Sequence, residues 1–308
     1  MHNKILIAID GSIHSKNATA YAADLFKNNT KVTFTLINIQ PIISQYLLDE
    51  ARCDAEAYAE LHKVMDKNKI ESENLLITEK ALLVQLGVDE QRIELISRPR
   101  MLGQVKDILE YAYRHRFDTL VIGRRGLTRL QTMFMGSTSA KIMEHAATLP
   151  IWIVDGKVTL DKALIALDAS ETSMRIIDYL AQMLSGNTQA RLCFFHVQLD
   201  AKDAHYSNAE MNPSLFNLIE RTEKNWREQF WPMAARRLQA AGIGDSQIKL
   251  INIKQKGRIS KAIMEQIEAA NYDTVVIGRS GSGNSFYFGR VARYIAERVT
   301  DRALWLVG

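Results

Sequence analysis

DTLVIGRRG at residues 118–126 and DTVVIGRSG at residues 273–281 decide how this chain is organised. Seven of the nine positions are identical, and the two stretches lie 155 residues apart. The segment KILIAIDGS at residues 4–12 recurs as KALIALDAS at residues 162–170, at an offset of 158 residues. Matching segments in the same order at nearly constant spacing indicate an internal repeat.

The carboxyl-terminal ends of the two copies also correspond. PIWIVDG at residues 150–156 matches ALWLVG at residues 303–308. Three repeated pairs predict two tandem copies of one domain, residues 1–156 and residues 157–308, in keeping with about 150 residues per domain. Because the join between them is short, we expect the copies to pack together rather than to be loosely tethered.

Composition excludes several classes of protein. Hydrophobic residues make up 47% and charged residues 24% of the chain, a globular balance, and the net charge of +4 is too small to predict binding to nucleic acid or to an anionic membrane. The two cysteines, Cys53 and Cys193, exclude a disulfide framework and a zinc site built from cysteines. No apolar run approaches the roughly 18 residues of a membrane span, and the start lacks the pattern of a secretory leader. We therefore expect a cytoplasmic protein.

Apolar runs and helical stretches alternate along both copies. Strands are expected at residues 5–9, 32–39, 92–97, 119–122 and 151–154, and again at 163–167, 191–197, 248–253, 274–277 and 304–307. Helices are expected at residues 15–28, 43–86, 103–115 and 138–147, and at 213–241 with a break near Pro232. This alternation predicts an α/β fold in which each copy is a doubly wound domain with a five-stranded parallel sheet. Ligands of such sheets bind beyond the carboxyl ends of the strands.

A loop punctuated by glycines follows the fourth expected strand. Glycines let backbone amides approach a phosphate, helix N-termini favour anions, and hydroxyl and guanidinium groups can donate to phosphate oxygens. The groups of these kinds are Gly123, Gly126, Gly136, Ser137, Thr138, Ser139, Arg124, Arg125 and Arg129. The alternative is a surface loop with solvated arginines that leads into an ordinary helix cap.

This loop resembles the ATP-binding pattern of the universal stress protein family. That pattern is Gly, two residues, Gly, nine residues, Gly and then Ser or Thr, which Gly123, Gly126, Gly136 and Ser137 match. Ile-Ala-Ile-Asp-Gly-Ser at residues 7–12 also resembles the start of the family's domain. The resemblance covers essentially the whole chain as two fused copies, and implies the adenine nucleotide α-hydrolase-like fold.

The resemblance also implies which residues bind ATP, with Mg²⁺ accompanying its phosphates. Asp10 would contact the adenine or ribose, Ala8 would line the pocket and Ile39 would pack on the adenine. Arg125 stands where some ATP-binding members carry histidine and keeps a donor there. Ribose and phosphates would be held by Ile122, Gly123, Gly126, Gly136, Ser137, Thr138 and Ser139. The alternative for Asp10 is a turn or cap role before the helix that follows, and this role is compatible with binding.

The second copy departs from the pattern. Only seven residues separate Gly281 from Gly289, and Arg290 replaces the hydroxyl residue. Asp168 persists at the end of the first strand. We expect weak ATP binding or none here. The alternative is a substitute cradle formed by Ser280, Ser282, Gly283 and Ser285.

Motifs of catalysis are missing. The sequence has no P-loop, nucleophile elbow or HExxH, and DGSIHS at residues 10–15 lacks the signatures of related adenylating and nucleotidyl-transferring enzymes. The chain is therefore predicted to be an ATP-binding regulatory protein of the stress response, with at most slow ATP hydrolysis. The alternatives are a protein-interaction module that binds no nucleotide, and an enzyme acting on an adenylated substrate.

The sequence also allows expectations about partners. The family's single domains pair through their fifth strands, which implies pairing of residues 151–154 with 304–307 inside this chain. A homodimer of the whole chain is compatible with this, and the sequence names no protein partner. The aromatic residues of the long helical stretches are expected mostly in the core, with a partner surface as the alternative. They are Tyr46, Tyr58, Phe216, Trp226, Phe230 and Trp231.

Overall fold

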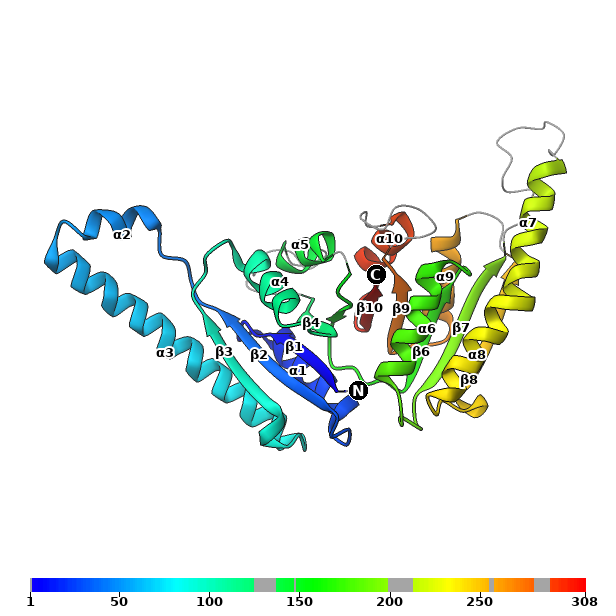
Figure 1. Cartoon of the computed structure of the whole chain (residues 1–308), viewed down its shortest axis with the longest axis horizontal. Helices are drawn as coiled ribbons and strands as arrows, with labels where there is room; N and C mark the ends of the chain where they lie inside the picture. Colours follow the sequence, from blue (N-terminus) through cyan, green and yellow to red (C-terminus); the bar gives the residue numbers. More distant parts are fainter. Residues whose placement is uncertain (1, 125–136, 147, 199–212, 255–257, 280–288) are drawn as a thin grey trace. The chain divides into compact units, whose positions relative to one another are not determined.

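The computed structural model describes residues 2–124, 137–146, 148–198, 213–254, 258–279 and 289–308 (Figure 1). The chain divides into two compact units, Met1–Lys157 and Val158–Gly308. Both units are mixed α/β domains, which confirms the predicted fold class.

The first unit is built on a parallel sheet in the order β3-β2-β1-β4-β5. Its strands are β1 (Asn3–Ala8), β2 (Val32–Ile39), β3 (Ile93–Arg98), β4 (Thr119–Gly123) and β5 (Ile151–Val154). Its helices are α1 (Ile13–Phe26), α2 (Gln45–Ala51), α3 (Ala55–Gln85), the short 3₁₀ helix η1 (Glu90–Arg92), α4 (Gln104–Arg114) and α5 (Ser137–His145).

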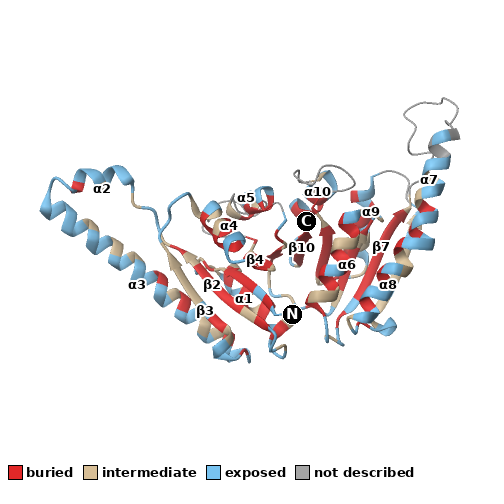
Figure 2. Cartoon of the chain, viewed as in Figure 1, coloured by how far each residue is buried: buried red, intermediate tan, exposed pale blue. Residues whose placement is uncertain are grey.

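The centre of this sheet is fully buried. Ile5, Leu6 and Ile7 of β1 have no exposed surface, as the continuous apolar run predicts for a strand covered on both faces (Figure 2). The strand order reverses at β1, because β2 and β3 lie on one side of it and β4 and β5 on the other. A crevice for ligands is expected at this reversal, at the carboxyl ends of β1 and β4.

The long helical stretch of the first unit folds as a hairpin. Asp54 caps α3 by accepting hydrogen bonds from the backbone N–H groups of Glu56 and Ala57, which separates α3 from α2. The inner half of α3 packs on β2 and β3, whereas its outer half extends with α2 away from the sheet (Figure 1). Tyr46 and Tyr58 are therefore exposed, and the expectation that most of these aromatics lie in the core is wrong for this unit.

The second unit repeats the architecture in the order β10-β9-β6-β7-β8, with parallel strands. The strands are β6 (Lys162–Leu167), β7 (Arg191–Gln198), β8 (Ile248–Lys254), β9 (Thr274–Gly278) and β10 (Ala303–Val307). The helices are α6 (Glu171–Met183), α7 (Pro213–Asn225), the π-helix η3 (Trp226–Phe230), α8 (Trp231–Ala240), the 3₁₀ helix η4 (Asp245–Gln247), α9 (Ile259–Ala269) and α10 (Arg290–Arg298).

Core packing repeats along with the topology. Trp152 of β5 is fully buried and meets the ring of Tyr21 edge-on at 5.8 Å between centroids. Trp305 of β10 is fully buried and meets Tyr179 in the same way at 6.1 Å. The repeat seen in the sequence is therefore also a repeat of side-chain contacts.

Pro232 lies in the first turn of α8, directly after the π-helix. Proline has no backbone N–H, and the first turn of a helix is where that loss is tolerated. The predicted break near this residue is thus a wide turn. Trp226 and Phe230 of this turn are buried, so these two aromatic residues do lie in the core. The ring of Trp226 stacks on that of His196, with 3.9 Å between the ring centroids.

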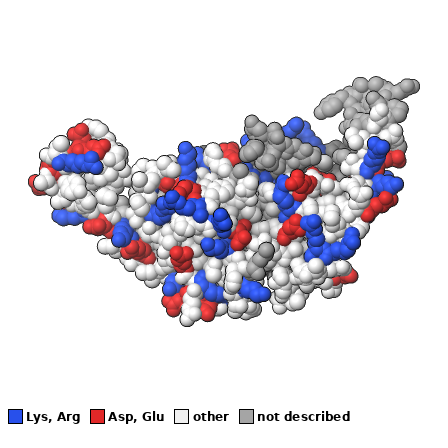
Figure 3. Space-filling view, viewed as in Figure 1, with Lys and Arg blue, Asp and Glu red and all other residues white. Residues whose placement is uncertain are grey.

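The described surface mixes charges of both signs. On the face drawn in Figure 3, lysine and arginine side chains lie among aspartate and glutamate side chains. Arg98 and Arg114, for example, both pair with Glu110, at 3.1 and 3.3 Å. Among the helices that the structure describes, none is long and apolar enough to cross a membrane.

Candidate functional site

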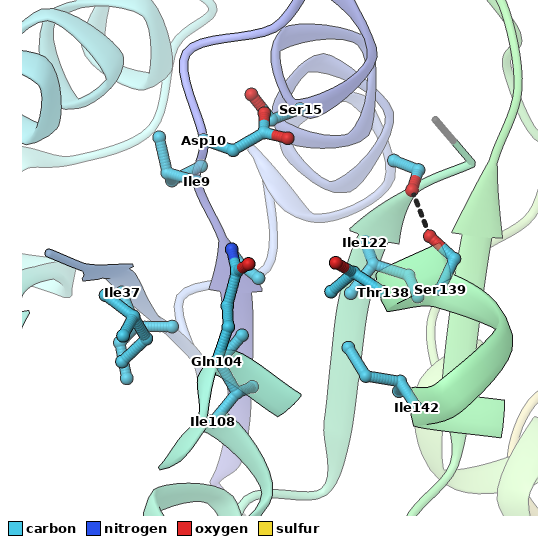
Figure 4. A pocket seen from close by; sticks show the side chains of 13 residues that line it. Ile9, Asp10, Ser15, Ile37, Gln104, Ile108, Ile122, Thr138, Ser139 and Ile142 are labelled. Carbon is cyan, nitrogen blue, oxygen red and sulfur yellow. Dashed lines mark hydrogen bonds between the residues drawn. The ribbon is translucent and has the colours of Figure 1, made fainter. Parts of the chain in front are cut away.

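A cleft opens in the first unit where the strand order reverses (Figure 4). It contains about 450 Å³ of space, including the open solvent at its mouth. Its lining residues are Ala8, Ile9, Asp10, Ser15, Ile37, Ile39, Gln104, Ile108, Ile122, Gly123, Thr138, Ser139 and Ile142. Seven of these belong to the predicted nucleotide-binding set: Ala8, Asp10, Ile39, Ile122, Gly123, Thr138 and Ser139.

The two sides of the cleft differ in chemistry. Apolar side chains come from β2 and α4, namely Ile37, Ile39 and Ile108. The other end combines the end of β4 with the first turn of α5, where Thr138 and Ser139 add hydroxyl groups to the apolar side chains of Ile122 and Ile142 and the helix dipole favours anions. The arrangement therefore suits a ligand with a flat apolar ring at one end and negative charge at the other.

Asp10 has the turn role that its sequence context allowed. Its Oδ1 accepts a hydrogen bond from the backbone N–H of Ser12 at 2.9 Å, across a turn in which Gly11 has a φ of +78°. Ser12 then caps α1 by accepting from the N–H of Ser15 at 3.1 Å. Within the described part of the chain, Asp10 Oδ2 accepts no hydrogen bond, so one carboxylate oxygen remains for a ligand.

A polar network behind the cleft holds the backbone that carries Asp10. Asn38 Nδ2 donates to the carbonyl of Ile9 at 2.7 Å, and Asn38 Oδ1 accepts from Ser72 Oγ at 2.7 Å. Ser97 Oγ donates to Ser72 Oγ at 2.7 Å, and Gln40 Nε2 donates to Ser97 Oγ at 2.8 Å. Each member satisfies the next, which fixes the end of β1 before any ligand arrives.

Gly123 is required by packing. A Cβ at this position would lie 2.6 Å from the carbonyl carbon, 2.7 Å from the carbonyl oxygen and 2.8 Å from the Cβ of His14. His14 belongs to α1, so the end of β4 touches the backbone of that helix. The sequence suggested only that this glycine clears space for a phosphate.

The two described hydroxyl side chains at the start of α5 have different roles. Ser139 Oγ donates to the Gly123 carbonyl at 2.9 Å, which ties α5 to the end of β4 and leaves this hydroxyl only as an acceptor. Thr138 makes no hydrogen bond through its side chain within the described residues, and its hydroxyl faces the cleft in Figure 4. Of the two hydroxyl groups that the structure describes here, Thr138 is therefore the one that keeps its proton to donate to a ligand.

The glycine loop itself falls largely outside the described residues. Arg125, Gly126 and Gly136 belong to the undescribed stretch. Ser137 begins α5, but its side chain is likewise outside the description.

Arg124 precedes the undescribed stretch and differs from expectation. It is 3% exposed and pairs with Asp155 at 3.5 Å, because the ends of β4 and β5 are neighbours. Arg124 is thus a buried ion-pair residue. The interpretation that it adds positive charge to an open phosphate loop is wrong.

Sequence reasoning missed the contribution of α4. Gln104 and Ile108 stand one turn apart at the start of this helix and line the cleft. The signal was present, since helices that follow parallel strands begin at the same edge as the strands' carboxyl ends. The sequence therefore places the start of the helix predicted at residues 103–115 at this edge, but nothing in it distinguishes Gln104 from an ordinary residue at a helix start.

The equivalent aspartate of the second unit is held differently. Asp168 Oδ1 accepts from Ser173 Oγ at 2.8 Å and from the Ser170 N–H at 3.1 Å. In the first unit the equivalent Ser15 Oγ donates to the backbone carbonyl of Ser12 at 2.9 Å and not to Asp10. Arg290 begins α10 and is exposed, while Ser280, Ser282, Gly283 and Ser285 lie outside the described residues.

Comparison with known proteins agrees with this architecture. The family model described as "Universal stress protein family" matches residues 1–155 and 159–300. Universal stress protein YxiE of Bacillus subtilis (strain 168) is 28% identical over 157 residues, covering 50% of this chain and 99% of that protein.

Two solved structures share the fold over nearly the whole chain. A universal stress protein from Archaeoglobus fulgidus DSM 4304 has a TM-score of 0.65 at 18% identity, covering 100% of this chain and 98% of that one. A functionally unknown protein from Pseudomonas aeruginosa PAO1 has a TM-score of 0.57 at 15% identity, covering 99% and 92%. With the family model matched twice in order, this chain belongs to the universal stress protein family and carries two copies of the family's domain in tandem.

Proposed function

We propose that the first unit binds ATP, or a closely related adenine nucleotide, together with Mg²⁺, and that the chain is a nucleotide-binding regulatory protein of the cytoplasmic stress response. One observation carries the proposal: predicted binding residues from β1, β2, β4 and α5, far apart in the sequence, meet in one cleft. That cleft lies at the strand reversal, where doubly wound sheets bind nucleotides.

The residues of the cleft fit the parts of the nucleotide. Ile37, Ile39 and Ile108 offer apolar surface to the adenine ring, while the short side chain of Ala8 leaves room at the floor. Asp10 Oδ2 would accept hydrogen bonds from the ribose hydroxyls.

The phosphates would lie at the other end, against the N-terminus of α5 and the hydroxyl of Thr138. No group of three His, Cys, Asp or Glu side chains able to hold a metal occurs among the described residues. Mg²⁺ would therefore be bound mainly through the phosphates. This ion, when bound, would neutralise phosphate charge.

We propose that the second unit is a degenerate partner that does not take up ATP. The residue after the last glycine of its loop is Arg290, where the first unit has Ser137, and only seven residues separate Gly281 from Gly289. Pairing of the two fifth strands stays a prediction from the family resemblance.

The proposal is tested by titration calorimetry of the full chain, stripped of nucleotide, with ATP and Mg²⁺. We expect one ATP per chain. Asp10→Asn keeps the oxygen that accepts from Ser12 and removes the charge, so it should weaken binding by about 10- to 150-fold, the worth of a charged hydrogen bond. Asp168→Asn makes the same change at the equivalent position of the second unit and should leave the affinity unchanged.

The other outcomes separate the alternatives. Two ATP per chain would show that the second unit binds as well. No binding at all would leave the protein-interaction module, and steady release of phosphate would favour the hydrolase.

A further inference from the structure

Gln104 is a polar side chain in the cleft that neither the glycine pattern nor the strand ends include. It is the first residue of α4 and is half-buried. In Figure 4 its side chain rises from α4 toward the end of β1, between Ile37 on one side and Ile122 with Thr138 on the other. Its amide group therefore lies inside the cleft.

The loop that carries Gln104 is held in place by a buried carboxylate. Asp107, 6% exposed, accepts hydrogen bonds from the backbone N–H groups of Met101 and Leu102 at 2.9 Å each, and of Gly103 at 3.2 Å. Gly103 has a φ of +115°, a conformation that glycine adopts without strain. The start of α4 is thus fixed by its own first turn, and Gln104 is presented from a rigid base.

The amide of Gln104 has hydrogen-bonding capacity to spare. Within the part of the chain that the structure describes, its side chain makes no hydrogen bond, and half of the other residues that line the cleft are isoleucines. A primary amide offers two N–H donors and a carbonyl acceptor in one plane. A ligand group with a donor beside an acceptor would satisfy both.

The position of Gln104 in the cleft determines which part of a bound nucleotide it would contact. With phosphates at the start of α5, the base lies toward β2 and α4, beside Ile37 and Ile108. Adenine presents its N6 donor next to the N7 acceptor, and a glutamine amide pairs with both. Guanine presents two acceptors, O6 and N7, on the same edge and leaves the amide carbonyl facing an oxygen.

We propose that Gln104 is the specificity-determining residue of this cleft and selects adenine over guanine by pairing with the N6/N7 edge of the base. The inference rests on the proposed function, because it requires a purine nucleotide in the cleft. It deepens that proposal by assigning recognition of the base to α4, separately from the ribose contact of Asp10 and the phosphate contacts of α5.

The test compares the affinities of the full chain for ATP, GTP and 7-deaza-ATP, which lacks N7. Wild type should bind ATP about 5- to 150-fold more tightly than GTP, the discrimination of one paired edge. Wild type should also bind 7-deaza-ATP more weakly than ATP. In Gln104→Leu, ATP and 7-deaza-ATP should bind alike, and the ratio of ATP to GTP affinity should fall toward one.

Controls separate base recognition from other effects. Thr138→Val should weaken ATP and GTP by the same factor and keep the ratio. Gln45→Leu changes the first residue of α2, outside the cleft, and should change no affinity. Gln104→Glu has nearly the same shape but cannot donate to N7, so it should also lose preference for ATP over 7-deaza-ATP.

Three results would overturn the inference. If wild type binds ATP and Gln104→Leu keeps its preference over GTP, Gln104 does not read the base, while the proposed function stands. If wild type binds ATP and 7-deaza-ATP equally, the N7 contact is wrong. If wild type binds none of the three nucleotides, the proposed function fails and this inference fails with it.

Discussion

Replacing Gly123 with alanine tests how the end of β4 is packed against α1. The new methyl group would lie 2.6 Å from the carbonyl carbon and 2.7 Å from the carbonyl oxygen of His14. Carbon atoms in contact normally stand about 3.5–4.0 Å apart, so about 1 Å must be regained by movement. The obstructing atoms belong to helix backbone, which cannot rotate aside as a flexible side chain can.

The expected loss of stability follows from this geometry. Overpacking a well-filled core costs about 1–3 kcal/mol, and a clash with backbone places Gly123→Ala at the upper end, about 3 kcal/mol. For a unit of this size that corresponds to a fall in the unfolding midpoint of about 6–12 °C. Binding should weaken as well, because β4 and α5 move together through the Ser139–Gly123 hydrogen bond.

The assay is scanning calorimetry of the full chain, with amide hydrogen exchange to assign the effect to a unit. Exchange in α1 and β4 should accelerate, while exchange in β9 of the second unit should not. Gly244→Ala is the control, since the nearest atom to its added methyl would be Ser246 Oγ at 3.9 Å, and no loss is expected there. A Gly123→Ala protein as stable as wild type would refute the packing argument.

Three further changes test the described contacts by urea unfolding. Arg124→Met should cost about 3–5 kcal/mol by removing one side of a buried ion pair, and adding Asp155→Leu should recover most of that loss. Burial raises the pKa of Glu79 above its ordinary 4.5, so the folded state binds the proton more tightly than the unfolded state does. The free energy of unfolding should therefore fall as pH rises from about 4.5 through the pKa of the folded state, and Glu79→Gln should remove this fall. Ala169→Gly should stabilise the second unit by about 0.5–1 kcal/mol, since its φ of 61° is strained for alanine and free for glycine.

A different result would contradict each of these three predictions. A double variant at Arg124 and Asp155 no more stable than the single one would mean that the pair does not explain the loss. An unchanged pH profile in Glu79→Gln would place the titrating group elsewhere, and a destabilised Ala169→Gly would show that the turn holds no strain.

Sequence patterns were sufficient for the elements and their order. The strand predicted at residues 32–39 and that at 151–154 coincide with β2 and β5, because apolar runs, turn residues and caps are local signals. The 43–86 stretch was predicted as mainly helical, but its division at Asp54 and the exposure of its outer half were not. The division and the exposure depend on where the sheet ends, and no local sequence pattern predicts that.

The sequence predicted those lining residues of the cleft that stand at the ends of strands. Asp10, Ile39 and Gly123 are the residues that strands deliver to one edge of a parallel sheet, and the cleft contains them. Gln104 escaped prediction because glutamine at the start of a helix is ordinary, and only the fold points it into the cleft. The prediction for Arg124 was wrong because its partner, Asp155, lies 31 residues further along the chain and is brought close only by the pairing of β4 with β5.

By itself, the sequence determined the tandem repeat, the α/β class, the order of strands and helices, and the family pattern in the first glycine loop. These follow from periodicity and spacing along the chain. Only the tertiary structure decided how equivalent groups are held: Ser173 Oγ donates to Asp168 Oδ1, whereas the equivalent Ser15 Oγ donates to the Ser12 carbonyl and not to Asp10. A hydrogen bond forms only when donor and acceptor lie within about 3 Å of each other in a suitable orientation, and those positions are fixed only once the helices and strands have packed.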